Sequence, residues 1–183
     1  QKGISIDHLP PSFFIGGNTK QVWENILRDD YDNWDVPTLQ EEYNAYKQDN
    51  PLPYKELIFP DVFKVLNEVN SRGLKIGLAS SSVKADILRA LEENHLDGFF
   101  DVVLSGEEFK ESKPNPEIYL TALQHLNVEA NQALIIEDSE KGIAAGVAAG
   151  VEVWAIKDNR FGMDQGAAKG LLDNLMDVLD LLK

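Results

Sequence analysis

Two adjacent carboxylates, Glu137 and Asp138, follow the short apolar run Leu134-Ile135-Ile136. Such a run is typical of a buried parallel strand, and open α/β sheets bind ligands beyond the carboxyl ends of their strands. Two hard oxygen donors in that place suit Mg²⁺, which takes one or two carboxylates and completes its shell with water and substrate phosphate. The alternative is an ordinary acidic helix start, in which Asp138 or Ser139 only caps the helix.

A helix rich in glycine and alanine is predicted directly after this pair. Ser139 is a good N-cap, and Gly150 suits the left-handed residue that ends many helices. Gly142 and Gly146 lie on one face of the helix, and two interior glycines cost about 2 kcal/mol relative to alanine. We expect that a close approach between this face and a sheet offsets the cost.

Three serines, Ser80, Ser81 and Ser82, follow a second apolar segment over residues 76–79. Serine hydroxyls and the free N–H groups at the start of the next helix together make a cradle for phosphate. The alternative is that these serines only cap that helix, a position in which serine is favoured.

Lys113 lies directly before two prolines, at positions 114 and 116. The prolines restrict the backbone here, so that the ammonium group can act as a fixed point charge for phosphate. The alternative is a solvated surface lysine, which is the usual state of this residue type.

The composition is that of a globular protein, with 183 residues of which 43% are apolar. There are 17 basic and 31 acidic residues, and the net charge of −14 argues against binding to nucleic acid or to anionic membranes. The sequence has no apolar stretch long enough to span a bilayer. It also has no cysteine, which excludes thiol nucleophiles and disulfides, and we expect a cytoplasmic protein.

The pattern of apolar residues divides the chain into two parts. Residues 1–57 form a small helical unit without a strand signal, and in residues 58–183 strands alternate with helices. This alternation predicts a doubly wound parallel sheet with flanking helices. Strands are expected at residues 76–79, 102–104, 134–136 and 151–156, and helices at residues 18–30, 36–49, 62–72, 116–126 and 171–182.

The serine, lysine and carboxylate segments resemble, in this order, the second, third and fourth motifs of the haloacid dehalogenase superfamily. The likeness is greatest to its β-phosphoglucomutase-like branch of phosphatases and sugar phosphomutases. The segments read Leu-Ala-Ser80-Ser-Ser, Ser-Lys113-Pro-Asn-Pro and Ile-Ile-Glu137-Asp138-Ser. The resemblance implies an α/β fold with a Rossmann-type core over residues 58–183 and a small helical cap over residues 1–57.

The resemblance assigns phosphate contacts to the first two segments. Ser80 would bind the transferring phosphoryl group through its hydroxyl, beside the backbone N–H of Ser81. Ser82 would belong to the same substrate-binding loop. Lys113 would neutralise the phosphate and the attacking nucleophile.

The resemblance also implies a Mg²⁺ cofactor and a cap that contacts the substrate. Asp138 would be a direct ligand of the metal, and Glu137 either a second ligand or a neighbour of the first. In the cap, Asn18 belongs to a loop that faces the substrate in this branch, and Lys47 occupies a position that could reach a sugar phosphate. The alternatives are an exposed turn and an exposed helical lysine.

The family's first motif, an apolar strand that ends in Asp-x-Asp, has no counterpart in residues 1–183. Asp30-Tyr31-Asp32 has the spacing but ends a helix, and Ile4-Ser5-Ile6-Asp7 is followed by Leu9 where the second aspartate is required. In the family the first aspartate attacks phosphorus and the second is the general acid and base. We therefore expect this strand before Gln1. It is central in the family's sheet, and without it the strands on either side lie about 10 Å apart.

These inferences predict a Mg²⁺-dependent phosphatase of small phosphorylated metabolites or sugar phosphates that works through an aspartyl-phosphate intermediate. The runner-up is a β-phosphoglucomutase-like phosphomutase, which needs a cap clamp for a second phosphate, most simply an arginine. The candidate cap loop at residues 16–21 holds Lys20 and no arginine, which favours the phosphatase.

An alternative hypothesis, from another functional class, is that the protein is a non-catalytic binding module that has lost its nucleophile. Residues 1–183 by themselves are expected to be inactive, because they lack the nucleophilic aspartate. The sequence does not reveal the oligomeric state, and we expect a monomer.

Overall fold

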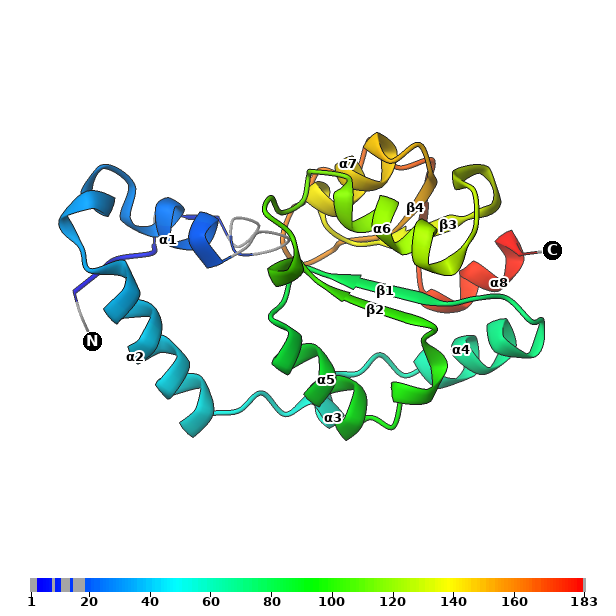
Figure 1. Ribbon diagram of the computed structural model, residues 1–183, viewed down its shortest axis with the longest axis horizontal. Helices are drawn as coiled ribbons and strands as arrows, with labels where there is room; N and C mark the ends of the chain where they lie inside the picture. Colours follow the sequence, from blue (N-terminus) through cyan, green and yellow to red (C-terminus); the bar gives the residue numbers. More distant parts are fainter. Residues whose placement is uncertain (1–2, 8, 11–13, 15–18, 183) are drawn as a thin grey trace.

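The computed structural model describes residues 3–7, 9–10, 14 and 19–182. Helices α1 (Thr19–Leu27) and α2 (Val36–Asp49) lie at one end of the molecule (Figure 1). A linker leads from α2 to the short helix α3 (Tyr54–Leu57), which packs beside α5 (Lys84–Glu93) (Figure 1). None of the described helices combines the length and the apolar character needed to cross a membrane.

Strands and helices alternate in the rest of the chain. The strands are β1 (Gly77–Ser80), β2 (Val102–Ser105), β3 (Leu134–Glu137), β4 (Glu152–Ile156) and β5 (Gly170–Leu172). The other helices are α4 (Val62–Ser71), α6 (Glu117–Leu126), α7 (Glu140–Ala148) and α8 (Val178–Leu181). Short 3₁₀ helices occupy Arg28–Asn33, Asp97–Phe99, Gly106–Glu108, Ala130–Gln132 and Leu175–Asp177. Every strand pair is parallel, and the predicted α/β fold class is confirmed.

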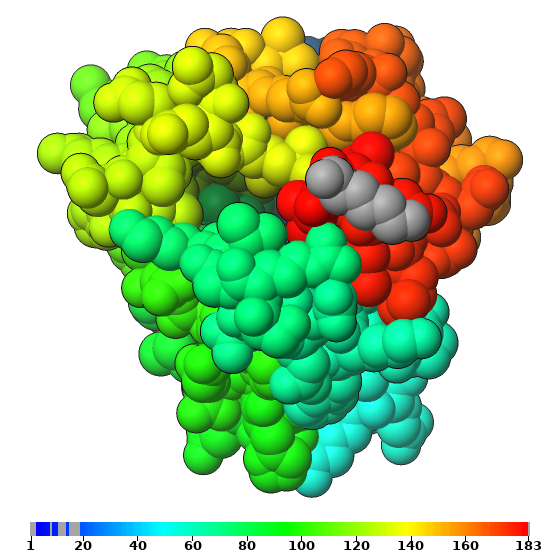
Figure 2. Space-filling view, turned by 90° about the vertical axis from the view of Figure 1, so that its right-hand side faces the viewer, coloured from blue at the N-terminus to red at the C-terminus, as the bar shows by residue number. Residues whose placement is uncertain are grey.

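The strands form two sheets, with the orders β1-β2 and β3-β4-β5. Among the described residues, β1 is paired only with β2, and β3 only with β4. In the space-filling view, a recess lies between the teal-green segment that leads into β1 and the yellow segment that leads into β3 (Figure 2). A separation of β1 from β3 is expected of a sheet that lacks its central strand, and the strand itself stays a prediction.

Helix α7 packs closely on the second sheet, as its glycines predict. A Cβ atom on Gly146 would lie 2.6 Å from Cγ2 of Val153 on β4, so only glycine fits without a shift. Both predicted ends of the helix are also confirmed. The Ser139 hydroxyl accepts a hydrogen bond from the N–H of Gly142 at 3.1 Å, and Gly150 has a φ of +75°.

The closing helix predicted over residues 171–182 is wrong. Residues 170–172 form β5, and α8 begins only at Val178. Between them, Oδ1 of Asn174 accepts a hydrogen bond from the N–H of Met176 at 2.9 Å, which starts a new helical turn. The apolar spacing was compatible with one helix, but residues 170–172 pair with β4 and the Asn174 cap starts a helical turn only after them.

The first predicted helix, over residues 18–30, also ends earlier than expected. Helix α1 stops at Leu27, and Arg28 has a φ of +51° at the start of the following 3₁₀ helix. A positive φ interrupts an α-helix, because this backbone conformation is left-handed. The second helix agrees with its prediction, since Asp35 caps it by accepting from the N–H of Thr38 at 3.2 Å.

Candidate active site

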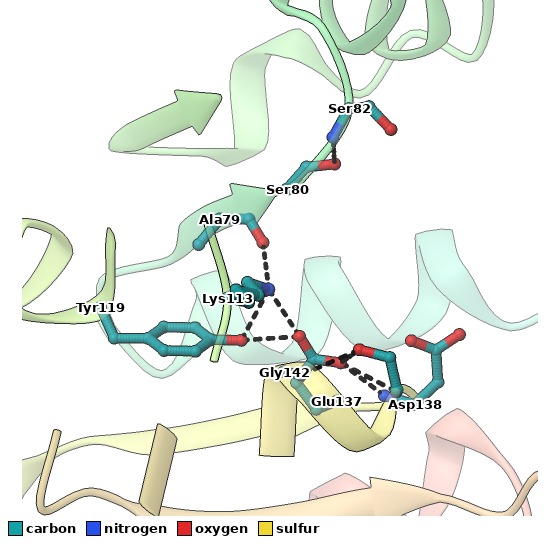
Figure 3. A network of polar contacts seen from close by, with 9 residues as sticks. Ala79, Ser80, Ser82, Lys113, Tyr119, Glu137, Asp138 and Gly142 are labelled. Carbon is teal, nitrogen blue, oxygen red and sulfur yellow. Dashed lines mark hydrogen bonds and ion pairs between the residues drawn. The ribbon is translucent and has the colours of Figure 1, made fainter. Parts of the chain in front are cut away.

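The ammonium group of Lys113 lies between the ends of β1 and β3 (Figure 3). It donates hydrogen bonds to the carbonyl oxygen of Ala79 at 3.1 Å, to the phenol oxygen of Tyr119 at 2.9 Å and to Oε1 of Glu137 at 2.6 Å. Only 5% of the lysine side chain is exposed, so the alternative of a solvated surface lysine is wrong. With three acceptors for its three protons, Lys113 joins two strands that do not pair with each other.

Glu137 accepts hydrogen bonds on both carboxylate oxygens. Besides Lys113, Oε1 accepts from the hydroxyl of Tyr119 at 2.7 Å. Oε2 accepts from the N–H groups of Asp138 and Ser139 at 2.9 and 3.0 Å, and from the Ser139 hydroxyl at 3.0 Å. Burial alone would raise the pKa of Glu137, but the Lys113 charge and these hydrogen bonds outweigh burial and lower the pKa to about 2. Glu137 is therefore a fixed anion at neutral pH.

Asp138 is exposed, and its carboxylate points away from this network (Figure 3). Partial shielding from water, followed by the adjacent charge of Glu137, raises the pKa of Asp138. A cation would relieve this repulsion, and a carboxylate oxygen is a ligand that Mg²⁺ prefers. The site therefore fits Mg²⁺ with Asp138 as the direct ligand, since the Glu137 oxygens are already engaged.

The structure shows a second reason for glycine in α7. A Cβ atom on Gly142 would overlap the carboxylate of Glu137, which lies over the first turn of this helix. Glu137 is the last residue of β3, so Gly142 allows α7 to approach the sheet at this carboxylate, as Gly146 does at Val153.

The serine loop after β1 is held by the neighbouring strand. The N–H of Ser82 donates to Oγ of Ser80 at 3.1 Å, which leaves the Ser80 hydroxyl able to donate its own proton to a ligand. The fully buried hydroxyl of Ser105 donates to the carbonyl oxygen of Ser82 at 2.8 Å. Ser105 is the register partner of Ser80, so the end of β2 fixes the loop that begins at the end of β1.

The start of α5 differs from the expectation of a serine cap. Val83 is the N-cap residue and makes no side-chain cap bond. The first helical N–H, that of Lys84, instead donates to Oε2 of Glu107 at 2.6 Å. The alternative in which the serines only cap this helix is therefore wrong. One N–H group that was expected to be free for phosphate is also occupied.

Three residues of this region were not predicted from the sequence. Tyr119 lies inside the helix predicted over residues 116–126, and the only signal for its role is that a buried phenol needs a hydrogen-bond partner. Ser105 directly follows the predicted strand 102–104, as Ser80 follows the segment 76–79. This shared position could have predicted that the two serines lie close together. Gln165 had no such signal, and its Nε2 donates to the carbonyl oxygen of Asp138 at 2.8 Å.

The cap residues are less closely tied to this site. Lys47 on α2 donates to Oδ2 of Asp86 on α5 at 3.1 Å, and its ammonium lies 5.5 Å from the ring centre of Tyr43. The side chain is one-third exposed, so it is neither buried nor free in solvent. Asn18, the other predicted cap contact, lies outside the described residues.

The chain belongs to the haloacid dehalogenase-like hydrolase family, whose model matches residues 6–156. The chain is 34% identical over 129 residues to a phosphorylated carbohydrates phosphatase of Thermotoga maritima. That alignment covers 68% of this chain but only 59% of the relative, so the chain spans less than two thirds of its length.

Solved structures give the same family and fold. A crystal structure from Thermotoga maritima, of a protein assigned as a β-phosphoglucomutase, is 28% identical with a TM-score of 0.68. It covers 82% of this chain and 72% of that one. A β-phosphoglucomutase of Clostridium difficile is 24% identical with a TM-score of 0.81, covering 97% of this chain and 82% of that one. At this lower identity the second likeness is evidence for the fold alone.

Proposed function

We propose that the protein is a Mg²⁺-dependent phosphatase of small phosphorylated metabolites, with sugar phosphates as the first candidates. The observation that carries the proposal is the buried ammonium of Lys113, held at 2.6 Å from Glu137 and at 3.1 Å from the end of β1. A positive charge fixed beside the serine loop is suited to the charge that develops on a transferring phosphoryl group. The phosphatase name of the 34% identical relative supports the same reaction class.

In this proposal the serine loop and Lys113 bind the phosphoryl group. The Ser80 hydroxyl donates to a phosphoryl oxygen, the N–H of Ser81 lies beside it, and Ser82 shapes the loop through its bond to Ser80. Lys113 exchanges one of its three present acceptors for a phosphate oxygen or for the nucleophile. The exchange needs no movement of the strands, because only a terminal ammonium group has to turn.

Asp138 would hold Mg²⁺ directly, and Glu137 is the second candidate ligand if it gives up one of its hydrogen bonds. The ion would supply positive charge for the phosphate of a substrate that approaches a protein of net charge −14. Gln165 keeps the backbone of Asp138 in place through its 2.8 Å bond to the carbonyl oxygen. The described residues contain no group of three or more potential metal-binding side chains, so water and substrate oxygens would complete the shell.

The attacking carboxylate would come from a strand between β1 and β3, outside residues 1–183. The division of the strands into two sheets supports this place, since the facing edges of β1 and β3 have no ladder partner among the described residues. An aspartate at the end of such a strand would attack phosphorus and displace the alcohol of the ester, which forms an aspartyl phosphate. Water would then hydrolyse this intermediate to inorganic phosphate and the free aspartate. A neighbouring aspartate would act as general acid and base.

A sugar phosphomutase is the second candidate function, favoured by the likeness to the structure assigned as a β-phosphoglucomutase. In that reaction a sugar hydroxyl, instead of water, receives the phosphoryl group. Both functions would use all the core residues proposed above. They would differ in the cap residues that contact the substrate. A non-catalytic module of the same fold is the candidate from another class.

The test uses the full-length protein with Mg²⁺ and a panel of phosphate esters. Phosphate release that falls at least about a hundredfold in both Lys113→Ala and Asp138→Ala would support the phosphatase. Formation of glucose 6-phosphate from β-glucose 1-phosphate, without net phosphate release, would instead support the mutase. Absence of turnover on every ester would contradict both enzymes and favour the binding module.

A further inference from the structure

Tyr119 is a buried tyrosine at the centre of the Lys113 network, with 7% of its surface exposed. Its hydroxyl accepts a hydrogen bond from Lys113 at 2.9 Å and donates one to Glu137 at 2.7 Å (Figure 3). The ammonium of Lys113 also lies 4.7 Å from the centre of its ring. One side chain thus touches both members of the buried ion pair.

The three contacts of Lys113 come from three different elements. Ala79 belongs to β1, Glu137 to β3 and Tyr119 to α6. An ion pair alone leaves an ammonium free to rotate and slide along a carboxylate edge, because Coulombic attraction has little directional preference. A hydroxyl that accepts from the lysine while donating to the glutamate adds two directional bonds, which fix both groups.

The phenol is suited to this task because one hydroxyl can both donate and accept a hydrogen bond. It donates to the Glu137 carboxylate and accepts from the Lys113 ammonium at the same time. Phenylalanine would keep the ring and its packing but would lose both hydrogen bonds.

We propose that Tyr119 is a positioning residue of the phosphoryl site, whose hydroxyl holds the Lys113 ammonium in place beside Glu137. This inference rests on the proposed function, and it adds a residue that acts through Lys113 without touching the substrate. Its effect is therefore expected on kcat more than on KM. Loss of a hydrogen bond that orients an active-site group commonly lowers activity by about tenfold.

The first test compares Tyr119→Phe with Tyr46→Phe in the full-length protein. Tyr46 is exposed on α2 and serves as a control for the chemical change. We expect Tyr119→Phe to lower kcat about tenfold with KM changed less than about twofold, and Tyr46→Phe to change neither. A kcat within about twofold of the wild type for Tyr119→Phe would overturn the inference.

A double-mutant cycle separates positioning of Lys113 from a general loss of packing. If Tyr119 acts through Lys113, Tyr119→Phe has little further effect on activity in a Lys113→Ala background. An equal loss in both backgrounds would mean that the hydroxyl acts independently of the lysine, which contradicts the proposal.

The second test does not depend on activity. We expect the ¹⁵N-labelled ammonium group of Lys113 to give a slowly exchanging NMR signal that shifts or broadens in Tyr119→Phe but not in Tyr46→Phe. An unchanged signal would overturn the inference, even if the protein proves to have no phosphatase activity. If Tyr119→Phe does not fold, 3-fluorotyrosine at position 119 keeps the hydroxyl and the shape. Because fluorine makes the phenol oxygen a weaker acceptor for Lys113, the lysine signal must still shift.

The two hypotheses therefore fail in different ways. An inactive wild-type protein with a Tyr119-dependent lysine signal would contradict the phosphatase and retain the network. An active wild-type protein with an unaffected Tyr119→Phe variant would retain the phosphatase and remove Tyr119 from its machinery.

Discussion

Lys113 and Lys47 each form an ion pair between distant parts of the chain, but the surroundings of the two pairs differ. In the core, the side chains of Lys113 and Glu137 are 5% and 8% exposed and lie 2.6 Å apart. At the contact between the predicted cap and core, the side chains of Lys47 and Asp86 are about one-third exposed and lie 3.1 Å apart. If the cap pair opens, water can solvate the charges of both Lys47 and Asp86. The charges of Lys113 and Glu137 are buried, and water cannot solvate them in this way.

The comparison teaches how this fold separates a rigid site from an adjustable contact. The core pair is surrounded by the directional hydrogen bonds of Tyr119, Ser139 and the β1 backbone, so its geometry is fixed before any ligand arrives. The cap pair involves flexible side chains on two helices and can open at little cost. In the proposed phosphatase, the first property would suit the phosphoryl-transfer site and the second would suit a cap that admits substrate.

The largest effect is expected for Lys113→Ala, which leaves Glu137 buried without a counter-charge. We expect the free energy of unfolding to fall by about 3–5 kcal/mol, because an unpaired buried charge is strongly destabilising. Urea denaturation at neutral pH measures the change. Lys169→Ala is the matched control, since its pair with Glu152 is exposed and screened by water, so that a much smaller loss is expected. Equal losses in the two variants would remove the contrast between buried and exposed pairs.

Next in size is Gly142→Ala, which forces the Glu137 carboxylate out of its place over α7. We expect a loss of about 1–3 kcal/mol in stability, partly offset by the better helix propensity of alanine, together with loss of phosphatase activity. Gly146→Ala is the control, because its Cβ meets Val153 and not the site. It should lower stability and leave the activity of the folded protein near wild type. Full activity in Gly142→Ala would contradict the assigned role of Glu137.

A smaller, pH-dependent effect should distinguish Glu137 from exposed carboxylates. Its pKa falls from an ordinary 4.5 to about 2 on folding, so the unfolded chain binds more protons between these values. The contribution of Glu137 to stability is therefore complete above about pH 4.5 and is lost as the pH falls toward 2. Asp138, whose pKa is raised, acts in the opposite direction.

Denaturation curves from pH 2.5 to 6 test whether the contribution of Glu137 to stability is lost, as expected, when the pH falls. Glu137→Gln should lose less stability on acidification than the wild type, measured from its own value at pH 6. Glu152→Gln, which alters an exposed pair on the next strand, should follow the wild type more closely. A steeper acid loss in Glu137→Gln than in the wild type would show that the assigned sign is wrong.

The smallest effect is expected for Lys47→Ala. Its pair with Asp86 is partly exposed, so its removal should cost less than about 1 kcal/mol and should raise KM by less than about fivefold. Comparison with Asp86→Ala tests the substrate contact proposed for Lys47. If Lys47 binds substrate, Lys47→Ala raises KM and Asp86→Ala does not. A KM unchanged in both variants would remove Lys47 from the substrate site.

The sequence predicted the core elements well because their signals are local. Apolar runs mark β1, β3 and β4, and Ser139 and Gly150 mark the ends of α7 by rules that depend on a few neighbouring residues. The prediction of the closing helix was wrong because it too was based on a local signal. The spacing of leucines near the C-terminus is compatible with a helix, but residues 170–172 pair with β4 and the Asn174 cap starts a helical turn only after them.

The candidate site could be predicted only in part. Lys113, Ser80 and Glu137 were found because their order along the chain matches family motifs. Tyr119 and Gln165 were missed because their roles depend on contacts between segments far apart in sequence, 18 residues from Tyr119 to Glu137 and 27 from Gln165 to Asp138. Gly142 was predicted to face the sheet, but the sequence did not show that the group it meets there is the carboxylate of Glu137, at the end of β3.

The central claim is that the serine loop, Lys113 and Asp138 surround one phosphoryl group. A crystal structure of the full-length protein with Mg²⁺ and inorganic phosphate tests it most directly. We predict phosphate oxygens about 2.7–3.2 Å from both the Ser80 hydroxyl and the Lys113 ammonium, with Mg²⁺ about 2.1 Å from an oxygen of Asp138. Phosphate bound away from Ser80 and Lys113, or Mg²⁺ bound without Asp138, would contradict it.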